Sequence, residues 1–247
     1  MANHILFIFE GEKTEKIIFN NLKKYYLNES KNTILCCFYC TDIYNLYNKV
    51  QKDTNLDLFF LIKEKEQNKK LLSNISRDDV SEIFLFFDYD GHAPAASDDK
   101  LEKMLLHFDE ETENGKLYIS YPMVEALKHL STDVDFKNII VDCKDNISYK
   151  NIIHKNSDKC YQDMNILSQL HWKTLISEHC KKLNHLMTDD FILPTQISTQ
   201  LDILKMQEKK HISTYKKVAV LSAFPLFIAD YYGYSKLPLL IDISSSK

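Results

Sequence analysis

Acidic side chains follow two apolar segments of the chain. ILFIF (5–9) runs directly into Glu10, and IFLFF (83–87) runs directly into Asp88 and Asp90. Side chains alternate along a strand, so Asp88 and Asp90 fall on one face about 6.6 Å apart, at ~3.3 Å per residue. Carboxylates that meet in one place raise one another's pKa, and a divalent cation removes that cost because Mg²⁺ prefers oxygen ligands. The pattern therefore indicates a shared Mg²⁺ or Mn²⁺ site.

The elements that must position these carboxylates are readable from the apolar pattern. Segments that are apolar on both faces are typical of strands in a parallel sheet covered by helices. The predicted strands are 5–9, 34–39, 83–87 and 116–120, and the predicted helices between them are 15–27, 42–50, 56–72 and 98–108. This order, β-α-β-α-α-β-α-β, predicts an open α/β sheet, which gathers ligands at the carboxyl ends of its strands. If the first and third strands are neighbours, Glu10, Asp88 and Asp90 converge.

The pattern changes after Pro122. Apolar spacing predicts helices over residues 123–130, 159–187 and 197–210, with 136–157 as a connection of uncertain structure. We therefore expect an α/β domain over residues 1–135 and a helical C-terminal subdomain over residues 136–247.

Bulk composition excludes several classes of protein. The 247 residues are 45% hydrophobic, which is enough for a large core. No apolar run reaches the ~20 residues of a bilayer-spanning helix and no secretory segment is visible, so we expect a cytoplasmic protein without membrane contact. The six cysteines are expected to be reduced thiols, because Cys37 and Cys40 lack the second ligand pair that a zinc site needs.

Charge is unevenly placed along the chain. Residues 1–135 carry 16 Lys and Arg against 24 Asp and Glu, a net −8, whereas residues 136–247 carry 15 against 11, a net +4. An acidic half beside a mildly basic half suits a metal site next to an anion-binding surface. Arg77 is the only arginine. Phosphate binding must therefore rely on lysines, backbone N–H groups or metal.

A strand ending in E-G, followed later by a strand ending in D-x-D, resembles the TOPRIM domain of topoisomerases, primases and related nucleases. FEGEKTE (9–15) is most similar to the RloB-like and OLD-like proteins of bacterial antiphage systems, which commonly act beside an ABC-type ATPase. The resemblance covers about residues 5–130. It implies a Rossmann-like parallel sheet flanked by helices, Mg²⁺ or Mn²⁺ held by Asp88 and Asp90, and Glu10 as a metal ligand or general acid/base.

The same resemblance points to further acidic residues. In the nuclease branch a glutamate follows the fourth strand, and YPMVEAL (121–127) places Glu125 there as a catalytic candidate. OLD-like proteins have a second acid four residues after the first. That position here is Thr14, with Glu15 one residue later, so Glu15 is the candidate metal ligand and Glu12 the alternative.

OLD-like nucleases also use a lysine from beyond the D-x-D region. HISTYKKVAVLSAF (211–224) offers Lys216 and Lys217, either of which could neutralise charge that develops on a phosphate. The resemblance thus implies a metal-dependent nuclease of DNA or RNA, an effector of phage defence with an ATPase partner. A homodimer is a further possibility that the sequence leaves open.

Two other interpretations remain open. FDYDG also resembles motif I of haloacid-dehalogenase-type phosphatases, in which Asp88 would be the nucleophile and Asp90 the acid/base. Asp189 or Asp190 would then serve a later motif, but His92 stands where that family usually has Thr or Val. The second alternative is a catalytically silent TOPRIM-like module that binds an ATPase.

Overall fold

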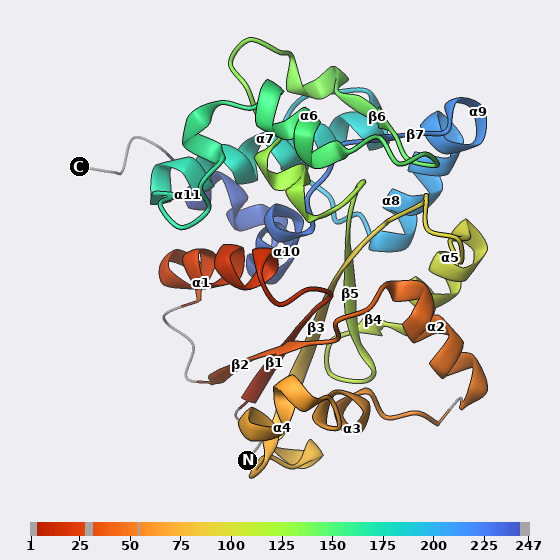
Figure 1. The fold of residues 1–247 in the computed structure, drawn as a ribbon. Helices are drawn as coiled ribbons and strands as arrows, with labels where there is room; N and C mark the ends of the chain where they lie inside the picture. The colour runs from red at the N-terminus through yellow and green to blue at the C-terminus, as the bar shows by residue number, and fades with distance from the viewer. Residues whose placement is uncertain (1–3, 28–31, 54, 243–247) are drawn as a thin grey trace.

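The computed structural model describes residues 4–27, 32–53 and 55–242, and it centres on one five-stranded sheet (Figure 1). The strand order is β2-β1-β3-β5-β4. Four strands are parallel and the short β4 is antiparallel to β5. The strands are β1 (His4–Phe9), β2 (Thr33–Phe38), β3 (Val80–Asp88), β4 (Asp109–Glu110) and β5 (Gly115–Ser120). The expected α/β protein with a mainly parallel sheet flanked by helices is confirmed, and so are its four predicted strands.

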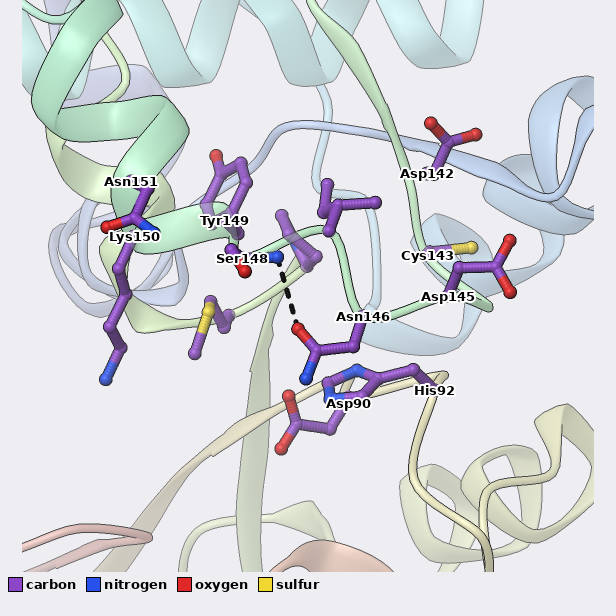
Figure 2. Close-up of a pocket in the computed structure, with 13 residues that line it drawn as sticks. Asp90, His92, Asp142, Cys143, Asp145, Asn146, Ser148, Tyr149, Lys150 and Asn151 are labelled. Atoms are coloured by element: carbon purple, nitrogen blue, oxygen red, sulfur yellow. Dashed lines mark hydrogen bonds between the residues drawn. The ribbon is translucent and has the colours of Figure 1, made fainter.

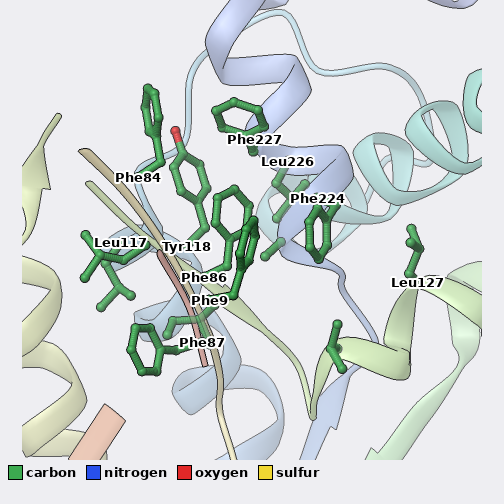
Figure 3. Close-up of a cluster of buried hydrophobic side chains, with 14 of the residues drawn as sticks. Phe9, Phe84, Phe86, Phe87, Leu117, Tyr118, Leu127, Phe224, Leu226 and Phe227 are labelled. Carbon is green, nitrogen blue, oxygen red and sulfur yellow. The ribbon is translucent and has the colours of Figure 1, made fainter. Parts of the chain in front are cut away.

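One face of the sheet is aromatic (Figure 3). Phe7 and Phe9 of β1 lie in register with Phe84 and Phe86 of β3, and period-two alternation directs all four rings to this face. The face is covered by α1 (Thr14–Tyr26) and α10 (Ala223–Tyr232). Phe86 stacks on Phe224 of α10 with ring centroids 4.9 Å apart. A helix from the predicted C-terminal region therefore shares the core of the sheet.

Four helices belong to the opposite side: α2 (Ile43–Lys52), α3 (Leu58–Lys63), α4 (Glu66–Leu72) and α5 (Asp98–His107). The buried Asn68 fixes α4 to β2, because its side chain bonds both the N–H (3.0 Å) and the carbonyl (2.9 Å) of Phe38. The single helix predicted over residues 56–72 is wrong. The chain breaks it at Lys65, whose backbone is extended and whose ammonium lies 4.2 Å from the Tyr39 ring centre.

The C-terminal region contains helices and a small second sheet of β6 (Ile140–Asp142) and β7 (Lys217–Ala219), which pair antiparallel. The connecting segment 136–157, whose structure the sequence left uncertain, thus supplies β6 and α6.

Besides α10, the α-helices of this region are α6 (Tyr149–Asn156), α7 (Gln169–Thr188), α8 (Gln200–Gln207), α9 (Ser213–Tyr215) and α11 (Leu237–Ile241); η5 (Glu208–Ile212) is a π-helix. Short 3₁₀ turns are η1 (Arg77–Asp79), η2 (Val124–Lys128), η3 (Phe136–Asn138), η4 (Lys159–Tyr161) and η6 (Tyr234–Lys236).

Two of the helices predicted after Pro122 need correction. The helix predicted from residue 159 begins only at Gln169, because Ser168 and His171 form a capping box that sets its start. The predicted helix over 123–130 is the 3₁₀ turn η2. Among the residues that the structure describes, no helix is both long and apolar enough to cross a membrane.

Candidate functional site

Glu10 and Asp88 meet where the two central strands end. Glu10 directly follows β1, and its backbone N–H donates to the carbonyl of Phe86 (3.0 Å), which continues the ladder to β3. Its carboxylate accepts a hydrogen bond from the backbone N–H of Asp88, with N···Oε2 3.0 Å. Asp88 ends β3 and is buried. The expected adjacency of the first and third strands is therefore confirmed, and it brings these two carboxylates together.

Asp90 is presented by a strained turn. Its φ of 41° lies in the left-handed region, which Asp tolerates better than most residues. The turn is held by two backbone bonds, Tyr89 N–H to the Ser120 carbonyl (3.0 Å) and Asp90 N–H to the Pro122 carbonyl (3.2 Å). Such outliers concentrate at functional sites, so the strain supports a functional role for Asp90.

Glu15 lies in the first turn of α1 and is buried, whereas Glu12 is exposed. The Glu15 carboxylate accepts a hydrogen bond from the backbone N–H of Gly11 (Oε1, 3.0 Å). A Cβ at position 11 would lie 2.9 Å from Glu15 Oε2, so glycine leaves the space that this carboxylate occupies. The structure therefore places Glu15, not Glu12, beside Glu10.

The carboxylates influence one another's ionisation. Burial raises the pKa of Glu10 to about 8, the Asp88 N–H opposes this, and Asp90 and Glu15 add to it. The pKa of Asp88 is also raised, first by burial and then by Glu10, Asp90, Glu15 and Glu125. We call these five residues the acidic site. The carboxylates of the acidic site repel one another when they are ionised, and a bound cation relieves that repulsion.

Glu125 reaches the acidic site from the 3₁₀ turn η2. Its side chain is only 7% exposed and pairs with Lys150 (Nζ···Oε1 3.2 Å). Its second oxygen, Oε2, is buried and has no hydrogen-bond partner among the described residues. A buried, unpartnered carboxylate oxygen is costly in isolation, so it marks a place for a cation or donor. The structure thus places Glu125, the candidate predicted from YPMVEAL, near the other acidic residues.

Lys150 is the cation of this site, and sequence reasoning missed it. It stands in the first turn of α6, and Glu125 raises its pKa most, with smaller effects from Asp88 and Glu15. Burial raises the pKa of Glu15 and of Asp90, and Lys150 opposes part of that rise. No local signal in the sequence identified it, because residues 136–157 carry no resemblance to the TOPRIM pattern.

Lys216 and Lys217 do not occupy this position. Lys217 begins β7 opposite Asp142, and Lys216 precedes it with a left-handed φ of 54°. The Lys216 carbonyl accepts from the N–H of Cys143 (3.0 Å), so its backbone supports the loop that leads to α6. Within the described chain, Lys150 and not either of these two lysines pairs with an acid of the acidic site.

A pocket of about 250 Å³ opens beside Asp90 (Figure 2). We call it the Asp90 pocket. One side is formed by Asp90 and His92, and the other by the loop and first turn that lead into α6. His92 lowers the pKa of Asp90, which burial otherwise raises. The lining residues are Asp90, His92, Pro122, Met123, Asp142, Cys143, Asp145, Asn146, Ile147, Ser148, Tyr149, Lys150 and Asn151.

The donor set suits a hard divalent cation. Within the described ranges, no three His, Cys, Asp or Glu side chains are arranged so that they could already hold a metal ion together. Mg²⁺, however, is usually bound by one or two carboxylates and retains several waters. Asp88 and Asp90 supply two such groups, and Glu10 lies against Asp88. The chemistry of these carboxylates, rather than a preformed geometry, is what would accept a partly hydrated Mg²⁺ or Mn²⁺.

Comparisons of the chain with protein families, curated proteins and solved structures found no match.

Proposed function

We propose that this protein is a Mg²⁺- or Mn²⁺-dependent nuclease that hydrolyses phosphodiester bonds of DNA or RNA. The observation that carries the proposal is the convergence of the acidic site and Lys150 at the carboxyl edge of a parallel sheet, next to the Asp90 pocket. Ligands of open α/β sheets bind at this edge. The proposal includes a TOPRIM fold for about residues 5–130, on the resemblance of the E-G and D-x-D elements.

Asp88 and Asp90 would hold the metal, with Glu10 and Glu15 beside them. When bound, the metal would activate a water and stabilise the leaving oxygen of the phosphodiester. Burial raises the pKa of Glu10 in the metal-free protein, and a neighbouring cation would favour its ionised form, which can orient that water and accept its proton. Glu15 is held in place by the Gly11 N–H.

Lys150 supplies the positive charge of the site. Its ammonium contacts only one oxygen of Glu125 (3.2 Å), and its side chain is 64% exposed. Because most of the Lys150 side chain is exposed, its ammonium can turn from Glu125 toward a phosphate with little loss of buried surface. A cation placed where charge develops on the phosphate stabilises the transition state. The Asp90 pocket, which Lys150 lines, adjoins the place where that phosphate would lie.

The phosphatase alternative is less well supported. It needs a further acid near Asp88, but Asp189 pairs with Lys210 (2.7 Å) at the end of α7. It also leaves Glu10 without a role, although Glu10 accepts the N–H of Asp88. Release of inorganic phosphate from p-nitrophenyl phosphate, measured beside nicking of plasmid DNA, separates the two activities. Phosphate release without nicking would favour the phosphatase.

A role in phage defence, with an ABC-type ATPase partner and a cytoplasmic location, is part of the proposal and rests on the sequence resemblance. Self-association into a homodimer belongs to the same proposal. A silent partner-binding module is the remaining alternative. If Asp88→Asn leaves protection against phage intact in cells while the variant protein accumulates normally, the silent module is correct.

A further inference from the structure

A second pocket, of about 200 Å³, is lined by five basic side chains. Three segments supply them: η3, the last turns of α7 and the π-helix η5. We call it the cationic pocket. Its basic residues are Lys137, Lys182, His185, Lys210 and His211, and its other lining residues are Asn138, Ile140, Leu186, Asp189 and Ala219.

Basic side chains outnumber carboxylates in the lining of this pocket. Asp189 is the one carboxylate of the lining, and it pairs with Lys210 (2.7 Å) through a side chain that is 80% exposed. Asp135, outside the lining, lies 3.6 Å from Lys137. Burial lowers the pKa of His211, and Lys210, Lys182 and His185 lower it further, as expected where cations face one another. An anion is the partner that relieves such repulsion.

The walls of the cationic pocket are held in place by hydrogen bonds. Lys182 is 1% exposed, and its ammonium donates to the Phe136 carbonyl (2.8 Å) and the Ile139 carbonyl (2.5 Å), which fixes η3 against α7. Nδ1 of His185 lies 2.8 Å from the Asp189 carbonyl, which orients the ring. The opposite wall is a π-helix, an uncommon element that occurs frequently at functional sites.

The size of the pocket suits a small anion. Sites for drug-sized organic ligands span ~300–1,000 Å³, so about 200 Å³ favours a phosphate group over a nucleoside. With Arg77 as the only arginine, lysines are the chain's main side chains for phosphate.

Strand β6 links the cationic pocket to the Asp90 pocket. Ile140, at one end of β6, lines the cationic pocket, and Asp142, at the other end, lines the Asp90 pocket. Two residues of strand span about 7 Å.

We propose that the cationic pocket binds a backbone phosphate of the nucleic-acid substrate, separate from the phosphate at the acidic site. This inference rests on the proposed nuclease function and adds a substrate-binding site to it. Lys137 and Lys210 make the contact, and Asp189 competes with the phosphate for Lys210.

The test is binding of fluorescein-labelled 12-nucleotide DNA and RNA by anisotropy, in EDTA so that no cleavage occurs, across a series of salt concentrations. The double variant Lys137→Gln/Lys210→Gln should bind about 10-fold more weakly, with a salt slope shallower by about 0.7, the loss of one phosphate contact on a single strand. Lys209→Gln is the matched control, because Lys209 is exposed on the same π-helix and does not line the pocket. It should change affinity by less than about 2-fold, by the same reasoning.

A second variant removes the risk that weaker binding reflects misfolding. Asp189→Asn frees Lys210 and should tighten oligonucleotide binding several-fold. Equal affinities for the wild type, the double variant and Asp189→Asn, or no binding by any of them, would overturn the inference. Pocket-dependent binding without cleavage under any metal would refute the nuclease and leave the phosphate site standing. If the wild type cleaves nucleic acid and Lys137→Gln/Lys210→Gln binds it with unchanged affinity, only the phosphate site is refuted.

Discussion

The backbone N–H of Asp88 donates to the carboxylate of Glu10 across the two central strands, with N···Oε2 3.0 Å. This bond joins residues 78 positions apart and aligns the two motifs of the acidic site. It also stabilises the ionised form of Glu10, against the larger effect of burial. The proposed function follows from Glu10 and Asp88, which this bond holds together.

Glu10→Gln should stabilise the metal-free protein at alkaline pH. Because the folded pKa of Glu10 is raised to about 8, the folded state retains a proton that the unfolded state releases, so stability falls as pH rises from about 4.5 through about 8. Removing this titration should raise Tm at pH 8.5 by roughly 2–8 °C and change it little at pH 4.5. Thermal unfolding in EDTA at both pH values measures this. Glu12→Gln, at an exposed position, is the control, and an equal shift in both variants would contradict the account.

Lys150→Met should slow cleavage about 100-fold, because it removes the cation nearest the acidic site. It should also move the acid limb of the pH–rate profile upward, since Lys150 lowers the pKa of Glu15 and of Asp90. Lys155→Met, exposed on the same helix, is the control. A rate loss in Lys150→Met without a shift of the profile would argue against direct electrostatic coupling.

Tyr89→Phe should loosen the D-x-D turn. Tyr89 donates its hydroxyl proton to Asp98, and Lys144 donates to the Tyr89 hydroxyl (2.7 Å) and to Asp98 (3.0 Å). Loss of this network should weaken Mn²⁺ binding by about 10-fold, the usual size for a supporting group, as measured by calorimetry. Tyr118→Phe removes a similar bond, to Asp230 (2.6 Å), and should leave Mn²⁺ affinity unchanged. Equal losses in both variants would indicate general destabilisation instead.

Gly11→Ala should displace the Glu15 carboxylate, since the new Cβ would lie 2.9 Å from Oε2. If Glu15 contributes to the metal site, Gly11→Ala and Glu15→Gln should each weaken Mn²⁺ binding, and the double variant should lose no more than the larger single loss. Additive losses would show that the two substitutions act independently and would remove Glu15 from the site.

The sequence was informative about the sheet because its strands are apolar on both faces. Glu10, Asp88 and Asp90 could be placed together because the carboxyl ends of neighbouring parallel strands meet. Glu125 was found from its resemblance to the nuclease pattern, and the choice between Glu12 and Glu15 needed the geometry of Gly11, which no periodicity encodes.

Lys150 was missed because it reaches the acidic site through tertiary packing of α6. The chain from Lys144 to Lys150 is short and polar and has no strong periodicity. The break at Lys65 and the late start of α7 at Gln169 depend on caps and single contacts that outweigh helical periodicity. Such local features decide element boundaries more than average apolar spacing does.

Incubation of purified protein with plasmid DNA and with total cellular RNA, with and without Mg²⁺ or Mn²⁺, tests the central claim most directly. The wild type should cleave at least one polymer only when metal is present. Glu10→Gln and Asp88→Asn should each lose at least about 100-fold in rate while remaining folded by circular dichroism. Metal-dependent cleavage that survives in both variants, or no cleavage by the wild type under any metal, would contradict the account.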